Sequence, residues 1–173
     1  VQARAIPIAM DGKDLLVQSR TGSGKTATFG IPAASKLIDI EKAETQALVL
    51  APTRELAMQV EKEVARIGAR SEFSTAAIYG GAAMGPQVDA LKRGVHFLAA
   101  TPGRLLDHIR RGNFDTSTVR LLVLDEADEM LSMGFLEEIN AILDALPDGR
   151  QTMLFSATIP TEIERLSERY LNK

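Results

Sequence analysis

The chain has 173 residues, of which 45% are hydrophobic and 25% charged, and its formal net charge is −3. This length fits one domain with a full core, and no apolar run approaches the roughly 20 residues that span a bilayer. The absence of cysteine excludes disulfides, thiol catalysis and thiolate metal sites, and two histidines are too few for a histidine metal cluster.

Positive charge is concentrated in the first part of the chain. Residues 1–112 hold 15 Lys and Arg against 11 Asp and Glu, whereas residues 113–173 hold 5 against 12. We therefore expect a surface that faces phosphates or nucleic acid to draw mainly on the first 112 residues.

Apolar runs alternate with helical spacing along the chain. We expect six strands, at residues 14–18, 46–51, 73–79, 95–100, 119–124 and 152–155. We expect helices at residues 1–10, 27–40, 54–68, 87–92, 104–111, 136–146 and 159–170. This alternation predicts one α/β domain over residues 1–173, with an open, mostly parallel sheet and helices on both faces.

A glycine-rich turn follows the first predicted strand and leads into a helix. It reads Ser19-Arg20-Thr21-Gly22-Ser23-Gly24-Lys25-Thr26. Backbone N–H groups in such a turn converge on an anion, and the helix N-terminus adds a partial positive charge. We expect Lys25 to reach the β- and γ-phosphates of a nucleotide and the Thr26 hydroxyl to ligate Mg²⁺. The alternative is an ordinary strand-to-helix turn that ends in Gly-Lys-Thr, and Ser19 stands where the usual pattern has its first glycine.

Distinctive residues also follow the other five predicted strands. These exits are Pro52-Thr53-Arg54-Glu55, Gly80-Gly81, Thr101-Pro102-Gly103-Arg104, Asp125-Glu126-Ala127-Asp128 and Ser156-Ala157-Thr158. Ligands of open α/β sheets bind at the carboxyl ends of the strands. We therefore expect all six exits to lie at one edge of the sheet.

The carboxylates that follow the fifth predicted strand point to catalysis. Asp125 comes after four apolar residues, which is the setting of the carboxylate that positions Mg²⁺ across nucleotide phosphates. Glu126 suits a general base or an orienter of the attacking water. The alternative is a charge pair at a helix N-terminus, which the upstream turn makes the weaker interpretation.

At this point the chain resembles the first RecA-like domain of the DEAD-box RNA helicases, over essentially its whole length. The resemblance implies an ATP-dependent RNA helicase with ATP and Mg²⁺ as cofactors, in which residues 19–26 form the ATP-binding loop. Gln2 matches the glutamine that reads the adenine edge in that family. Residues 52–55, 80–81 and 101–104 resemble the motifs that hold the phosphates and sugars of one RNA strand without reading its sequence.

The last strand exit resembles the family motif that couples ATP binding to strand separation. The resemblance implies that the hydroxyls of Ser156 and Thr158, on either side of Ala157, hydrogen-bond Asp128. Taken alone, Ser-Ala-Thr before Pro160 is more typical of a helix N-cap.

The chain departs from the family pattern in three ways. Ser19 replaces the usual alanine, the upstream aromatic residue that stacks on adenine is missing, and so is the second RecA-like domain with its arginine fingers. We therefore expect a monomeric, cytoplasmic piece of a longer protein, without a membrane partner, which binds ATP and RNA weakly and does not unwind RNA alone. The alternatives are a P-loop ATPase that acts on DNA and an ATP-gated RNA clamp.

Overall fold

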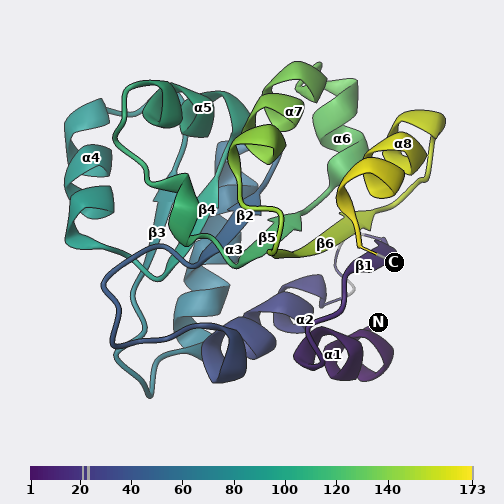
Figure 1. Ribbon diagram of the computed structural model, residues 1–173, viewed down its shortest axis with the longest axis horizontal. Coiled ribbons are helices and arrows are strands. Elements are labelled where there is room, and N and C mark those ends of the chain that lie inside the picture. Colours follow the sequence, from purple (N-terminus) through teal and green to yellow (C-terminus); the bar gives the residue numbers. More distant parts are fainter. Residues whose placement is uncertain (21, 23, 173) are drawn as a thin grey trace.

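A six-stranded parallel sheet forms the centre of the computed structural model, which describes residues 1–20, 22 and 24–172 (Figure 1). The strand order is β1-β6-β5-β2-β4-β3, and every neighbouring pair is parallel. The strands are β1 (Leu15–Gln18), β2 (Ala47–Leu50), β3 (Thr75–Ile78), β4 (Phe97–Ala100), β5 (Leu121–Leu124) and β6 (Gln151–Ser156).

Helices cover both faces of this sheet (Figure 1). One face carries α1 (Gln2–Met10), α2 (Lys25–Pro32) and α3 (Arg54–Ile67). The other carries α4 (Met84–Arg93), α5 (Pro102–Arg110), α6 (Ala127–Ser132), α7 (Leu136–Ala145) and α8 (Thr161–Tyr170). The predicted parallel sheet with helices on both faces is thus confirmed.

The central strands explain why the sequence contains uninterrupted apolar runs. All residues of β2, β4 and β5 are buried. In β2, Leu48 and Leu50 pack into the core under α5 to α8, while Ala47 and Val49 pack into the core under α1 to α3. Since successive side chains point to opposite faces, a strand buried on both sides needs an apolar residue at every position.

Parallel pairing brings all six strand exits to one edge of the sheet, as expected. Thr21 and Ser23, two residues of the predicted phosphate turn, lie outside the described residues.

No helix among the described residues combines the length and apolar character that a membrane-spanning helix requires.

The helix predicted at residues 27–40 is wrong in both boundaries. α2 begins at Lys25 and ends at Pro32, and a π-helical turn at Ala33–Leu37 follows it. Pro32 has no N–H group to donate to the preceding turn, so the α-helical hydrogen bonding stops there and the chain widens to the π form.

A second difference is α6, which the sequence analysis did not predict. It follows β5 after only Asp125 and Glu126, and its six residues are too few to display a helical period. Elsewhere the predicted elements exist with shifted ends: β3 is shorter than residues 73–79, and α4 is longer than residues 87–92.

Gly94→Ala is expected to lower the free energy of unfolding by more than about 2 kcal/mol. Gly94 has a φ of +76°, and a Cβ there would overlap the backbone carbonyl of Ala43. The left-handed backbone alone costs an alanine about 1–2 kcal/mol, and the overlap adds to that cost. Chemical denaturation measures the loss. The matched control is Gly112→Ala, at a φ of +70° with open space around the new Cβ; equal losses in the two variants would contradict the overlap.

Candidate functional site: a phosphate turn facing two carboxylates

The phosphate turn connects the exit of β1 to the start of α2. Ser19 N donates a 2.9 Å hydrogen bond to Ser156 O, which extends the pairing of β1 with β6. Gly24 then adopts a left-handed conformation with a φ of +77°, and α2 begins at Lys25. The turn therefore ends directly above the helix N-terminus, where backbone N–H groups lack helical partners.

Gln2 contacts this turn from α1. Its side-chain Nε2 donates a 3.1 Å hydrogen bond to the carbonyl of Gly24. A Cβ at position 24 would overlap the same Nε2 atom. Glycine is thus required here both by the backbone conformation and by the close approach of Gln2.

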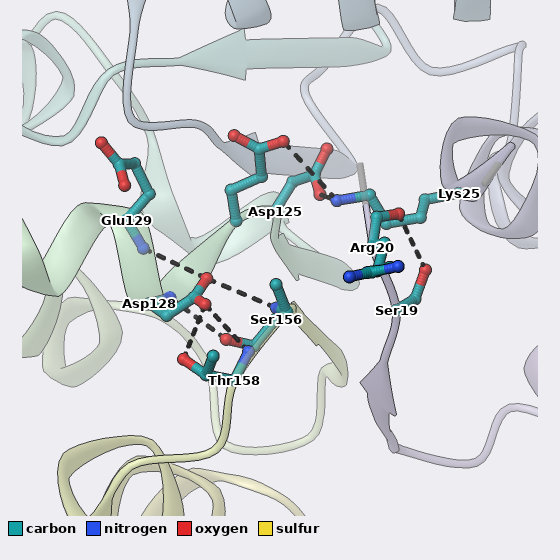
Figure 2. A network of polar contacts seen from close by, with 10 residues as sticks. Ser19, Arg20, Lys25, Asp125, Asp128, Glu129, Ser156 and Thr158 are labelled. Carbon is teal, nitrogen blue, oxygen red and sulfur yellow. Dashed lines mark hydrogen bonds and ion pairs between the residues drawn. The ribbon is translucent and has the colours of Figure 1, made fainter. Parts of the chain in front are cut away.

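Lys25 lies between the two carboxylates that follow β5 (Figure 2). Its Nζ is 3.0 Å from Asp125 Oδ1 and 3.8 Å from Glu126 Oε1. Lys25 is only 7% exposed and Asp125 only 2%. The site is therefore a buried ion pair that joins the exits of β1 and β5 across the intervening β6.

The carboxylate oxygens have capacity for a further cation. Asp125 Oδ1 and Glu126 Oε1 are buried and accept no hydrogen bond of regular geometry from the described residues. Among those residues, no group of three or more His, Asp and Glu side chains forms a metal cage. Mg²⁺ is usually held by one or two carboxylates together with substrate phosphates, so Asp125 and the nearby Thr26 hydroxyl fit such an ion.

Glu126 has an unusual backbone and an altered acidity. Its φ of +53° is the only positive φ at a non-glycine position in the described part of the chain, which costs about 1–2 kcal/mol. Burial raises the pKa of its carboxyl; the charge of Lys25 opposes this rise and that of Asp125 adds to it. A carboxylate with a raised pKa is a better proton acceptor near neutral pH.

A pocket of about 220 Å³ lies in front of these residues. Its walls include Leu56, Gln59 and Glu63 of α3, which the sequence analysis missed. These positions are three and four residues apart, so they form one helix face. That spacing, directly after the exit at residues 52–55, was the signal that could have identified them.

Asp128 connects the exits of β5 and β6 (Figure 2). Its Oδ2 accepts hydrogen bonds from Thr158 Oγ1 at 2.8 Å and from Thr158 N at 2.9 Å, and its Oδ1 accepts one from Ala157 N at 3.4 Å. The predicted bond from the Thr158 hydroxyl is confirmed. The predicted bond between the Ser156 hydroxyl and Asp128 is confirmed as well: Ser156 Oγ accepts a bond from Asp128 N at 3.2 Å, because this N–H in the first turn of α6 has no helical acceptor.

These hydrogen bonds change the acidity of Asp128. Burial acts to raise its pKa, but the bonds from the hydroxyl and backbone of Thr158, with those from Ser156 and Ala157, outweigh burial and lower the pKa below its usual value. The hydrogen bonds therefore favour the ionised, carboxylate form of Asp128.

The exits of β2 and β3 contact each other through Arg54 and Tyr79. The Arg54 guanidinium lies over the Tyr79 ring, 5.0 Å from its centroid. Thr53 begins α3 as its N-cap, with Oγ1 accepting a 3.2 Å bond from Leu56 N. Pro52 is buried, while Arg54 and Glu55 are exposed. Tyr79 was not among the predicted site residues.

Gln87 organises the exits of β3 and β4. Its Oε1 accepts bonds from Arg104 Nη1 at 3.1 Å and from His108 Nε2 at 3.2 Å, while its Nε2 donates to Tyr79 O at 3.1 Å. Arg104 also donates to Ala82 O at 3.0 Å, just after Gly80-Gly81. His108 is fully buried, and burial followed by the charge of Arg104 lowers its pKa. A neutral His108 thus helps to fix Arg104 beside the glycine loop.

The sheet topology, together with the residues gathered at the carboxyl ends of the strands, places the chain in the RecA-like class of nucleotide-binding α/β domains. A family model described as DEAD/DEAH box helicase matches residues 1–166. The chain therefore belongs to the DEAD/DEAH box helicase family.

Relatives and a solved structure agree with this assignment. The chain is 50% identical over 173 residues to the DEAD-box ATP-dependent RNA helicase CshA of Geobacillus kaustophilus, covering all of the chain and 37% of that protein. It is 48% identical over 171 residues to CshA of Streptococcus pneumoniae, covering 99% of the chain and 32% of that protein. A DEAD box protein from Methanococcus jannaschii matches with a TM-score of 0.94 at 42% identity, over 98% of this chain and 46% of that one. The chain thus spans about a third of the length of these curated relatives.

Thr158→Val is expected to raise the pKa of Asp128 toward the ordinary value of about 3.9. The substitution removes the hydroxyl that donates to Asp128 Oδ2 at 2.8 Å. An NMR titration of the Asp128 carboxyl measures the change. The control is Thr161→Val, an exposed position at the start of α8, which should leave the pKa unaltered.

The Thr158→Val variant should also change how the free energy of unfolding depends on pH. The pKa of Asp128 is lower in the folded chain than in the unfolded one. The ionised Asp128 carboxylate therefore stabilises the fold fully at any pH above the pKa that Asp128 has in the unfolded chain. The effect is lost as the pH falls through the folded pKa. The two proteins should therefore differ most in free energy of unfolding near pH 7 and converge in acid. A difference that grows on acidification would contradict this linkage.

Proposed function

We propose that the chain is the ATP-binding domain of an ATP-dependent RNA helicase. The observation that carries this proposal is the buried Lys25, held by Asp125 and Glu126 at the end of the phosphate turn. Its relatives are named as ATP-dependent RNA helicases. Because the chain covers only part of them, the activity of the whole protein belongs to the proposal.

In the proposed site, the chain's own residues hold the phosphates of ATP. Lys25 and the N–H groups at the start of α2 bind the phosphate oxygens, and Gln2, fixed beside the turn, reads adenine at its edge. Thr26 and Asp125 hold Mg²⁺, which when bound neutralises charge on the phosphates. Glu126 orients the attacking water and accepts its proton, a role that its raised pKa favours.

RNA binds, in this proposal, along the exits of β2, β3 and β4. Arg54 and Arg104 supply positive charge, and the loops around Thr53, Gly80-Gly81 and Thr101 supply backbone and hydroxyl groups. Such contacts reach phosphates and sugars, so binding is independent of base sequence. The support is the preorganisation of this edge: Tyr79 positions Arg54, and Gln87 positions Arg104.

ATP hydrolysis is coupled to RNA unwinding through Asp128 and the exit of β6. Asp128 follows the catalytic pair by two residues and is bonded to Ala157 and Thr158, so a shift at one exit is transmitted to the other. A second RecA-like domain of the longer protein supplies the cations that stabilise the transition state. We propose that efficient turnover requires both domains.

Lys25→Ala is expected to weaken ATP and ADP binding by about a hundredfold or more, since it removes a charge-assisted contact to phosphate. Titration with a fluorescent nucleotide measures the affinity, and circular dichroism verifies the fold, because Asp125 also loses its buried cation. The control is Lys92→Ala, which removes the same charge at the exposed end of α4. Unchanged ATP affinity in the Lys25 variant would refute the assignment of the phosphate turn.

Glu126→Gln is expected to preserve ATP binding but to lower kcat by about a hundredfold or more, the effect typical of losing a general base. The measurement is steady-state ATP hydrolysis with single-stranded RNA, in the longer protein that includes the second domain. Glu129→Gln, at the exposed neighbouring carboxylate of α6, is the matched control.

Two outcomes of this assay contradict the proposal. Normal turnover in the Glu126 variant would remove Glu126 from the chemistry. Stimulation of the wild-type ATPase by DNA and not by RNA would favour a DNA-acting ATPase. Unwinding of a short RNA duplex separates a helicase from an ATP-gated RNA clamp.

A further inference from the structure

A second pocket lies at the edge of the sheet opposite the phosphate turn. Its volume is about 760 Å³, and it adjoins the first residues of β1, β5 and β6. Four cationic side chains line it with a single carboxylate, namely Lys13, Lys36, Arg120 and Arg150 with Asp14. No residue of the candidate nucleotide site contributes to its walls.

Arg150 is a buried cation without a direct ion pair among the described residues. It is only 6% exposed and forms no ion pair with a carboxylate of the described residues. Its Nη1 donates to the carbonyls of Pro147 at 2.7 Å and Leu146 at 3.4 Å, while its Nε has no acceptor among those residues. Asp148, Asp14 and Asp144 act on this guanidinium only from beyond ion-pair distance. Buried charges in proteins are normally paired, so a ligand can supply the direct anionic partner that Arg150 does not have.

The carboxylate in the pocket is already engaged elsewhere. Asp14 accepts backbone hydrogen bonds from Thr152 N at 2.7 Å and from Asn172 N, which holds it against β6 and the chain end. Lys13 and Arg120 are exposed, and neither forms an ion pair with the described residues. None of the four cations of the pocket therefore forms a direct ion pair among the described residues.

The pocket floor is fixed by hydrogen bonds. Gln151 Nε2 donates to Lys13 O at 2.6 Å and to Ala9 O at 3.0 Å, and Lys36 Nζ donates to Met10 O at 2.8 Å. These bonds tie the end of α1, the start of β6 and the turn after α2 together. The backbone that carries these cations is thus held in place, and the side chains of Lys36 and Arg150 are fixed by their own hydrogen bonds, which lowers the entropy cost of binding.

We propose that this pocket binds a small molecule with several phosphate groups. Lysine and arginine are the side chains that bind phosphate oxygens, arginine through its planar fork. The pocket has several cations and only one carboxylate, which is already hydrogen-bonded, so its charge matches that of a polyvalent anion. The volume of the pocket lies within the range of small-molecule sites. The proposal is independent of the assignment of the phosphate turn as an ATP site.

An NMR titration with tripolyphosphate tests the proposal on the unmodified chain at constant ionic strength. The amides of Gly12 and Gly149 report on this pocket, and those of Gly22 and Gly24 report on the phosphate turn. We expect saturable shifts at Gly12 and Gly149 with an affinity separate from that of the turn. Shifts confined to Gly22 and Gly24 would overturn the proposal.

Charge-matched variants sharpen the test. The double variant Lys13→Gln/Arg120→Gln should weaken tripolyphosphate binding at Gly12 and Gly149 about tenfold, from two exposed charges, and leave binding at the turn unaltered. Lys92→Gln/Arg93→Gln removes two exposed charges outside the pocket and should change neither. Equal weakening by both double variants would indicate unspecific attraction and overturn the proposal.

Two further measurements complete the test. Arg150→Gln should weaken binding more than either exposed substitution alone; if this variant does not fold, the double variant still decides the outcome. A single-stranded RNA oligonucleotide that titrates Gly12 and Gly149 more tightly than tripolyphosphate would overturn the proposal in favour of an RNA path.

Discussion

The rest of the site depends on the buried ion pair between Lys25 and Asp125. Burying two charges costs several kcal/mol per ion, and this cost is offset only where the geometry is held firmly. Here the sheet holds it: Lys25 begins the helix after β1, and Asp125 directly follows β5. Without the ammonium, Asp125 and Glu126 would repel each other in a poorly solvated place. Lys25 therefore keeps the two carboxylates together. In the proposed nucleotide complex, Lys25 would bind the phosphates and Mg²⁺ would supply the positive charge beside Asp125.

The strained backbone of Glu126 is explained by the elements on either side of it. Before it, β5 is locked between β2 and β6; after it, α6 starts at Ala127 and is tied to β6 through Ser156 and Thr158. A chain confined in this way can keep one residue at a φ of +53°, since the surrounding contacts outweigh the strain of about 1–2 kcal/mol. The same confinement places Glu126 two residues from Asp128, whose carboxylate is bonded to the exit of β6.

Local sequence was sufficient for the strands, most of the helices and the strand exits, because apolar runs, helical spacing and the glycine turn are short-range signals. It was not sufficient where the outcome depends on long-range packing. Gln87 is one polar residue in an amphipathic helix, and only the folded chain brings it to Arg104 and His108. α6 is too short to be periodic, and Ser156 could bond either the carboxylate or the N–H of Asp128 until the position of α6 was known.

Charge along the chain does not by itself determine charge in space. The excess of Lys and Arg in residues 1–112 led us to expect a phosphate-facing surface to draw mainly on that part. Yet the opposite pocket takes Lys13 and Lys36 from that part and Arg120 and Arg150 from the acidic remainder. The reason is topological: β1, β5 and β6 are neighbours in the sheet although they lie far apart in the sequence. The same three strands therefore carry the phosphate turn and its carboxylates at one end and the proposed polyphosphate pocket at the other. Their buried residues form one close-packed core between the two ends.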